Sequence, residues 1–124
     1  MDGLICLGTF SRTTVRRINE FQKPHIYVDA VGNRSTGDSI VTDIRHSVQG
    51  VMEYLWEQGH RQIGFVGGYE LDSDGKEIFD SRLPVYQQFL KEKGVLCDSF
   101  IKIGGYTAKH GYRLMKELLN EVRQ

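Results

Sequence analysis

Short apolar runs alternate along this chain with longer stretches in which apolar residues recur every three or four positions. The short runs are typical of buried strands, and the spaced stretches are typical of amphipathic helices. Their alternation is typical of βαβ units in a parallel sheet. We predict strands at residues 4–7, 25–28, 39–42, 62–66 and 100–103. Leu4–Leu7 is continuous enough to be buried on both faces.

The stretches between these strands predict helices with one apolar face each. The residues on these faces are Val15, Ile18 and Phe21; Val48, Val51, Met52, Leu55 and Trp56; Tyr86, Phe89 and Leu90; and Tyr112, Leu114, Met115, Leu118 and Leu119. Polar residues that can cap helix starts precede them, at Ser11 or Thr13, Asp80 or Ser81, and Thr107. Gly59 and Gly94 are placed to end helices in the left-handed conformation.

The stretch Gly59–Gly68 organises the rest of the pattern, because it joins a helix stop to a short strand and a glycine pair. We predict that the chain leaves the strand at Gly67 and continues as a long acidic loop to Phe79. Ligands of open α/β sheets bind at the carboxyl ends of the strands. The loop after Val66 is therefore the first place to look for function.

Composition narrows the class of protein. Sixteen basic residues balance sixteen acidic ones among 124 residues, so the chain has no electrostatic reason to bind nucleic acid by itself. No apolar run approaches the length that spans a membrane. Cys6 and Cys97 have neither zinc-site nor disulfide spacing and read as spectator thiols in a reducing cytosol.

Three side chains of different chemistry follow predicted strands or their loops. They are Asp29, Arg82 and Tyr106. A carboxylate and a guanidinium can each make two hydrogen bonds to neighbouring hydroxyls, and an aromatic ring can pack on the apolar face of a sugar. Each also has a structural interpretation: Asp29 could close a turn, Arg82 could be solvated, and Tyr106 could cover the core.

Enzyme chemistry has little support in the sequence. Neither a Gly-x-Gly-x-x-Gly fingerprint, nor a Walker motif, nor a Gly-x-Ser-x-Gly elbow is present. The histidines lack metal-ligand spacing, and the acidic loop does not match an EF-hand. We predict a protein that is not an enzyme and has no cofactor and no metal site.

Several segments together resemble the effector-binding domain of bacterial repressors of the lactose/galactose-repressor (LacI/GalR) family. They are 2–5, 26–29, 39–43, 54–55, 59–68, 81–83 and 111–115. The run Gly-His-Arg-Gln-Ile-Gly-Phe-Val-Gly-Gly is the most specific of them. The loop Gly8–Ser11 and the segment Gly105–Thr107 are most similar to repressors of the galactose-operon type.

The resemblance implies an α/β fold with an open parallel sheet, Rossmann-like and of the type I periplasmic-binding-protein kind. It implies that residues 1–43 are part of a DNA-proximal lobe and 44–124 part of a distal lobe, with a hinge near residues 42–44. Both lobes would be incomplete, and the family's helix-turn-helix domain would be absent. We therefore expect exposed sheet edges and apolar helix faces that favour self-association.

The family's effector contacts map onto Asp29, which would bond sugar hydroxyls, Arg82, a forked donor, and Tyr106, a stacking platform. Thr9 and Phe10 are further positions that face the ligand in the family. This chain departs from the family at Ser47, Pro84 and Val85, where the first and last are often glycine in relatives. These departures concern helix packing near Arg82.

The resemblance implies a cytoplasmic, sugar-responsive transcription repressor. A galactose-like or other hexose would bind between the lobes and alter operator DNA binding through the helix-turn-helix module of a homodimer, with no membrane partner. Two alternatives remain open at this point. One is a sugar-binding protein of a transport system with the same fold, and the other is a nucleotide-binding α/β enzyme that uses Gly67–Gly68.

Overall fold

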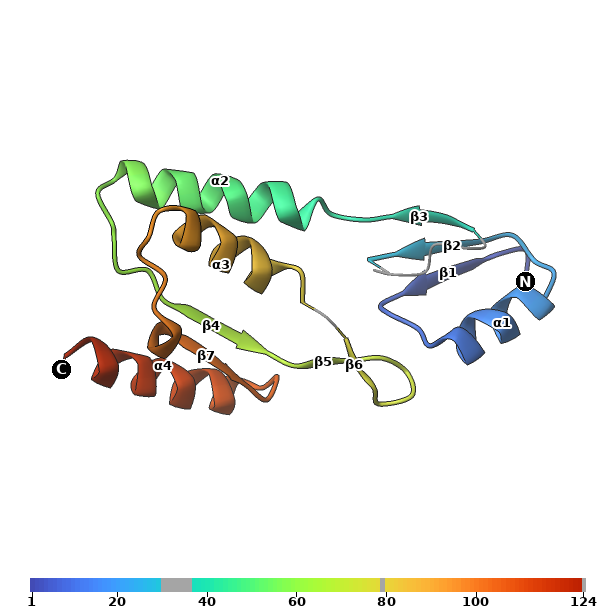
Figure 1. Cartoon of the computed structure of the whole chain (residues 1–124). Coiled ribbons are helices and arrows are strands. Elements are labelled where there is room, and N and C mark those ends of the chain that lie inside the picture. The colour runs from blue at the N-terminus through green and yellow to red at the C-terminus, as the bar shows by residue number, and fades with distance from the viewer. Residues whose placement is uncertain (30–36, 79, 124) are drawn as a thin grey trace. The chain divides into compact units, whose positions relative to one another are not determined.

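The computed structural model describes residues 1–29, 37–78 and 80–123, and it confirms an α/β fold with parallel strands (Figure 1). The chain forms two compact units. The first unit is Met1–Thr42 with Leu71–Ile78, and the second is Asp43–Glu70 with Phe79–Gln124. The first of these boundaries follows Thr42, and the hinge near residues 42–44 stays a prediction. The predicted loop 32–38 lies largely outside the described residues.

The first unit is built on a parallel sheet with the strand order β1–β2–β3. Its strands are β1 (Leu4–Leu7), β2 (His25–Val28) and β3 (Asp38–Ile40), and its helix is α1 (Arg12–Glu20). Ser11 caps α1, because its side chain accepts a hydrogen bond from the Thr14 N–H at 3.3 Å. The core of this unit joins Cys6, Val15 and Tyr27.

The prediction that β1 is buried on both faces is wrong. Successive side chains of a strand point to opposite faces of the sheet. Cys6 is buried in the core with α1, whereas Ile5 and Leu7 are 73% and 70% exposed. The predicted strand 39–42 is also shifted, since β3 begins at Asp38 and ends at Ile40.

A hairpin occupies most of the segment that was predicted to be a long loop. It contains β5 (Glu70–Leu71) and β6 (Glu77–Ile78). The Asp72 carboxylate shapes the turn by accepting hydrogen bonds from the N–H groups of Asp74 and Lys76, both at 2.9 Å. Gly75 has a φ of 76°, which glycine adopts most easily. In the first unit, the Ser73 hydroxyl accepts a hydrogen bond from the Ser11 N–H at 3.0 Å.

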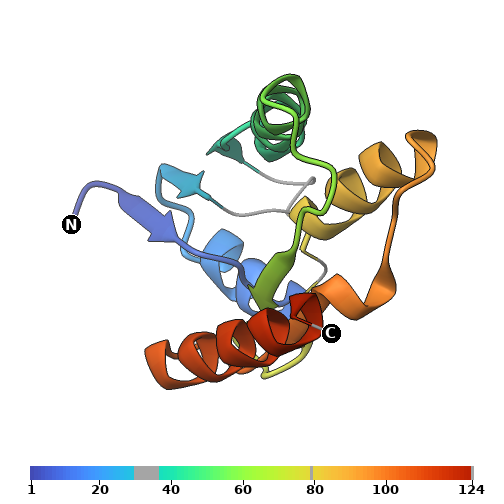
Figure 2. The same ribbon diagram turned by 90° about the vertical axis from the view of Figure 1, so that its left-hand side faces the viewer.

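The second unit has helices on both sides of a parallel strand pair, β4 (Phe65–Gly68) and β7 (Ile101–Gly104). On one side lie α2 (Ile44–Glu57) and α3 (Arg82–Glu92), and on the other lies α4 (Ala108–Val122) (Figures 1 and 2). A short 3₁₀ turn, η1 (Asp98–Phe100), leads into β7. The buried core between the strands and the first two helices comprises Met52, Tyr86, Phe89 and Leu90.

The fourth strand was predicted at 62–66 but runs from Phe65 to Gly68. The start of β4 is set by its partner strand, β7, which begins only at Ile101. Phe65 pairs with Ile101, so residues 62–64 would pair with residues 98–100, which form the 3₁₀ turn instead of a strand. The Ile63 carbonyl accepts a hydrogen bond from the Tyr86 hydroxyl at 2.6 Å. Burial raises the pKa of Tyr86 to about 12, so this donor keeps its proton at neutral pH.

Helix α4 is less buried than its sequence predicts. Leu114 and Leu118 lie against the strand pair, where Leu118 faces Gly64 and Leu114 faces Gly104. The other apolar residues of the predicted face are largely exposed, namely Tyr112, Met115 and Leu119. The face of α4 that contacts the strands is therefore narrower than the apolar face predicted from the sequence. Thr107 caps the helix as predicted, since its hydroxyl accepts a hydrogen bond from the His110 N–H.

Gly59 and Gly94 end α2 and α3 as predicted, with φ values of 91° and 73°. The N–H of Gly59 donates to the Trp56 carbonyl, and the next N–H, of His60, donates to the Leu55 carbonyl. These paired bonds are those of a Schellman motif. The same arrangement recurs after α3, where the Val95 N–H donates to the Leu90 carbonyl.

Substituting the two glycines of α2 and its C-terminal cap, Gly50 and Gly59, should change stability in opposite directions. A side chain at Gly59 is strained by its positive φ, so Gly59→Ala should lower the free energy of unfolding by about 1 kcal/mol. Gly50 lies inside α2 with open space where a Cβ would be, so Gly50→Ala should raise it by about 1 kcal/mol. Urea unfolding followed by the fluorescence of Trp56, the single tryptophan, measures both. Shifts of the same sign would contradict this account.

Candidate functional site

A cavity of about 460 Å³ opens at the carboxyl ends of β4 and β7, within the second unit. Its size is that of a small-molecule site. Its walls come from β4, from the start of α3 and from the turn between β7 and α4. The residues that line it are Phe65, Val66, Gly67, Gly68, Asp80, Arg82, Gly105, Tyr106, Thr107, Ala108, Gly111 and Leu114.

Glycine at position 68 allows Tyr106 to lie directly over the end of β4. A Cβ on Gly68 would stand 2.5 Å from Cδ2 of the Tyr106 ring, a distance that real atoms do not tolerate. Tyr106 is nevertheless 67% exposed as a residue, so its ring touches the strand while much of the side chain stays open to solvent. The glycine pair that was predicted to leave the strand instead belongs to it, opposite Ile103 and Gly104.

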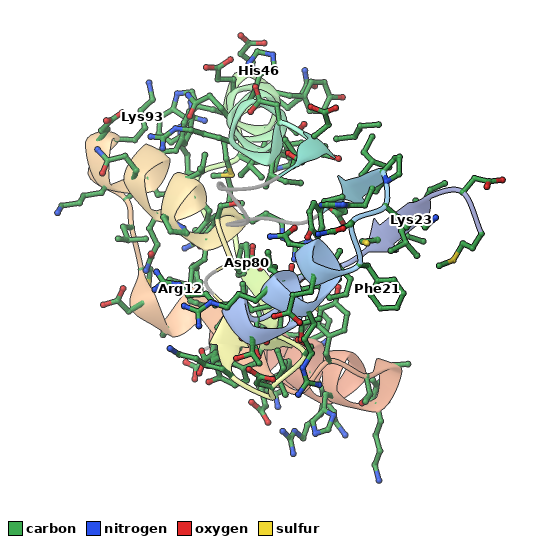
Figure 3. The ribbon with its side chains drawn as sticks, turned by 90° about the vertical axis from the view of Figure 1, so that its right-hand side faces the viewer. Arg12, Phe21, Lys23, His46, Asp80 and Lys93 are labelled. Carbon is green, nitrogen blue, oxygen red and sulfur yellow. The ribbon has the colours of Figure 1, made fainter. Side chains whose placement is uncertain are left out.

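Arg82 begins α3. It is held by Asp80, which lies two residues earlier in the chain and is labelled in Figure 3. Its Nε donates to Oδ1 of Asp80 at 2.9 Å, and its Nη2 donates to Oδ2 at 3.0 Å. The Arg82 backbone N–H also donates to Oδ1 at 2.9 Å, so the carboxylate satisfies the first turn of the helix. Glu70 adds a second carboxylate, 3.6 Å from Nη2.

The pair is ionised at neutral pH. Burial alone would raise the pKa of the Asp80 carboxyl, but the hydrogen bonds and the charge of Arg82 outweigh burial and hold this pKa below its ordinary value. The pKa of Arg82 is raised, chiefly by the side-chain hydrogen bonds to Asp80 against the effect of burial. The nearby Tyr106 side chain and the charge of Glu70 add to this rise of the Arg82 pKa. The cavity is therefore lined by a carboxylate and a guanidinium that both stay charged at neutral pH.

The first turn of α4 forms the opposite wall of the cavity. The Thr107 hydroxyl lies 2.6 Å from Nδ1 of His110 and also caps the helix. A Cβ on Gly105 would stand 2.7 Å from the His110 ring, so this position too requires a residue without a side chain. The wall is thus made of backbone and short polar groups, which can approach a ligand closely.

The structure brings two of the predicted site residues, Arg82 and Tyr106, to one cavity. The other three belong to the first unit. Asp29 has a φ of 59°, and its N–H donates to the Ile40 carbonyl at 2.9 Å, which continues the hydrogen bonding between β2 and β3 past the end of β2. The Phe10 ring packs at 6.1 Å from Tyr27, and Thr9 is half-buried. Ligand-binding roles for all five residues stay predictions.

Sequence reasoning missed the two carboxylates that accompany Arg82. Asp80 was considered only as a cap or as part of an acidic loop, and Glu70 was not considered at all. The Asp-x-Arg spacing at the start of a predicted helix could have identified Asp80, because it allows both a helix cap and an ion pair. Nothing in the sequence brings Glu70 to Arg82, since that contact depends on the path of the hairpin.

A parallel α/β unit with a cavity at the carboxyl ends of its strands is the architecture of a small-molecule-binding domain. The family described as periplasmic binding protein-like domains matches residues 52–124. The chain is 35% identical over 114 residues to the HTH-type transcriptional regulator GalR of Streptococcus thermophilus, covering 91% of this chain and 34% of that protein. It is 26% identical to the HTH-type transcriptional regulator GanR of Bacillus subtilis, covering 98% of this chain and 37% of that protein.

Solved structures show the same fold. The transcription regulator CcpA of Lactococcus lactis superposes with a TM-score of 0.73 at 19% identity, covering 98% of this chain and 44% of that one. A transcription regulator from Lactobacillus plantarum superposes with a TM-score of 0.68 at 21% identity, covering 94% and 44%. At these identities the likeness concerns the fold alone.

The chain belongs to the periplasmic binding protein-like domain family and, within it, to the effector-binding domains of LacI/GalR-type regulators, as the sequence indicated. It spans about a third of the length of the curated relatives it matches. Within residues 1–29, 37–78 and 80–123, no helix is both long enough and apolar enough to cross a bilayer.

The Asp80–Arg82 pair predicts a pH dependence of stability. A carboxyl whose pKa is lower in the folded chain stabilises the fold above its unfolded pKa of about 3.9, and this contribution is lost as the pH falls through the folded-state pKa. Asp80→Asn should therefore cost about 0.5–1 kcal/mol at pH 7, reduced by solvent screening of the partly exposed Arg82, and little at pH 2.

Urea unfolding at pH 7 and pH 2, followed by Trp56 fluorescence, checks this expectation. Asp98→Asn, at an exposed position of the same unit, is the matched control and should change stability little at either pH. An equal cost of Asp80→Asn at both pH values would mean that the ionised pair contributes nothing.

Proposed function

We propose that this chain is the effector-binding part of a sugar-responsive transcription repressor, and that the cavity of the second unit holds the sugar. The observation that carries the proposal is the meeting of Arg82, Asp80 and Tyr106 at the carboxyl ends of β4 and β7. The regulatory part is supported by the relatives, which are named HTH-type transcriptional regulators and repressors.

The chemistry of the cavity suits a hexose. Asp80 occupies Nε and one N–H of Nη2, so the Nη1 group of Arg82 is the part best placed to donate to a ring hydroxyl. The exposed ring of Tyr106 offers an apolar face for the C–H groups of a pyranose. Backbone groups of residues 105–108 add hydrogen-bonding partners. Asp29, Thr9 and Phe10 of the first unit are further candidate ligand contacts by family resemblance.

In this proposal the ligand acts by changing a conformational equilibrium. The residues up to Asp43 belong to the DNA-proximal lobe and the following ones to the distal lobe. A sugar that binds one arrangement of the lobes more tightly shifts the population toward it. In a cytoplasmic homodimer this shift alters operator affinity through a helix-turn-helix module of the whole protein. The protein performs no catalysis and uses no cofactor.

The regulator is favoured over the two alternatives. A transport-linked sugar-binding protein would share the fold and the cavity, but the relatives are named as transcriptional regulators. A nucleotide-binding enzyme would use the Gly67–Gly68 pair as a phosphate loop. Those glycines are instead paired residues of β4, with Tyr106 resting on the second of them.

The test is binding of hexoses to the cavity. In a ¹H–¹⁵N NMR titration that extends to tens of millimolar sugar, galactose or another hexose should shift the amide signals of Gly68 and Gly105. Arg82→Ala should weaken the best ligand by about 1.5–3 kcal/mol, because a hydrogen bond to a charged group is lost. Arg113→Ala removes a guanidinium from the exposed side of α4 and should leave the affinity unchanged.

Equal affinities of the wild-type chain and Arg82→Ala would remove Arg82 from the site. Amide shifts caused by nucleotides but not by any hexose would favour the enzyme alternative.

A further inference from the structure

We infer that Asp80 and Glu70 make this cavity selective for uncharged sugars over sugars that carry a phosphate or a carboxylate. The inference rests on the proposed function and specifies the ligand of the same site. The two carboxylates face different N–H groups of the Arg82 guanidinium and leave few of them for a ligand.

The Arg82 guanidinium presents its N–H donors in a planar fork. Arginine binds phosphates and carboxylates best through two parallel N–H groups, either Nε with one Nη or the two Nη groups. Asp80 occupies the pair formed by Nε and Nη2, at 2.9 and 3.0 Å. Because a carboxylate of this chain already fills that edge, an incoming anion cannot bind there.

The other edge of the guanidinium is formed by Nη1 and Nη2. Glu70 lies 3.6 Å from Nη2, so a second negative charge already faces this side. An anion bridging Nη1 and Nη2 would have to approach that carboxylate, and like charges held close together repel strongly. A sugar hydroxyl needs only one N–H, from Nη1, and brings no charge.

The charges around the cavity nearly balance. Among the described residues that line it, Asp80 and Arg82 are the charged ones, and they cancel. Glu70 leaves the surroundings of the guanidinium with a net negative charge. The N-terminal turns of α3 and α4 both border the cavity, and each brings a partial positive charge of about one half, so together they offset about one carboxylate. The surroundings therefore give an anion no net attraction, and the occupied edge of the guanidinium leaves Nη1 for a neutral hydroxyl.

The experiment compares sugars that differ in charge at one carbon. Galactose, galacturonate and galactose 6-phosphate are titrated into the ¹⁵N-labelled chain, and the amide signals of Gly68, Gly105 and Tyr106 report binding. We expect galactose to bind at least about tenfold more tightly than either anion at low ionic strength. The preference should shrink as salt is added, because salt screens repulsion between partly exposed charges.

Variants then assign the preference to the two carboxylates. Glu70→Gln removes a charge from an exposed side chain and should narrow the preference about two- to fivefold, mainly by strengthening binding of the anions. Asp80→Asn should narrow it more, about tenfold, because it also frees the Nε edge for a bidentate anion. Glu117→Gln is the matched control. It removes the exposed partner of Arg113 on α4, and the preference should not change.

The outcomes separate this inference from the proposed function. Galacturonate or the phosphate binding as tightly as galactose would overturn the inference and leave a sugar site. A preference for galactose that Glu70→Gln leaves unchanged would overturn the role of Glu70, even if Asp80→Asn failed to fold. No amide shifts with any of a panel of neutral hexoses and their anionic derivatives would overturn both the inference and the sugar-binding function.

Discussion

The ion pair between Asp80 and Arg82 joins the fold of the second unit to its chemistry. The same carboxylate satisfies the backbone at the start of α3 and orients the guanidinium that faces the cavity. A change at Asp80 would therefore disturb a helix start and a binding group together. The pair also explains why an arginine in the first turn of a helix, an electrostatically unfavourable position, is tolerated: its charge is neutralised locally.

Two glycines, which have no side chain, shape the cavity as much as the charged groups do. Gly68 lets an aromatic ring rest on the strand, and Gly105 makes room for the His110 ring. Larger residues at these two positions would push the ring of Tyr106 or of His110 toward the space that a ligand needs. The ring of Tyr106 and the guanidinium of Arg82 border the same cavity. The position of the ring, which Gly68 permits, therefore affects the space in which a ligand can reach Arg82.

Features that depend on neighbouring residues were predictable from the sequence. The caps at Ser11 and Thr107 and the helix stops at Gly59 and Gly94 follow from local hydrogen bonding and backbone freedom. Features that depend on distant partners were not. The start of β4 is set by the 3₁₀ turn before β7, and the exposure of Ile5 depends on what covers the sheet. For the site, residue type identified Arg82 and Tyr106, while Glu70 required the three-dimensional path of the hairpin.

The hairpin has a consequence for dissecting the chain. Residues 71–78 belong to the first unit although the segments on both sides of them belong to the second, so neither unit is one continuous piece of sequence. A cloning boundary or a protease cut between Thr42 and Asp43 would deprive the first unit of Ser73, the hydrogen-bond partner of the Ser11 N–H at the start of α1. Isolating either unit intact therefore calls for a circular permutation or a shortened linker in place of the hairpin, not a simple truncation.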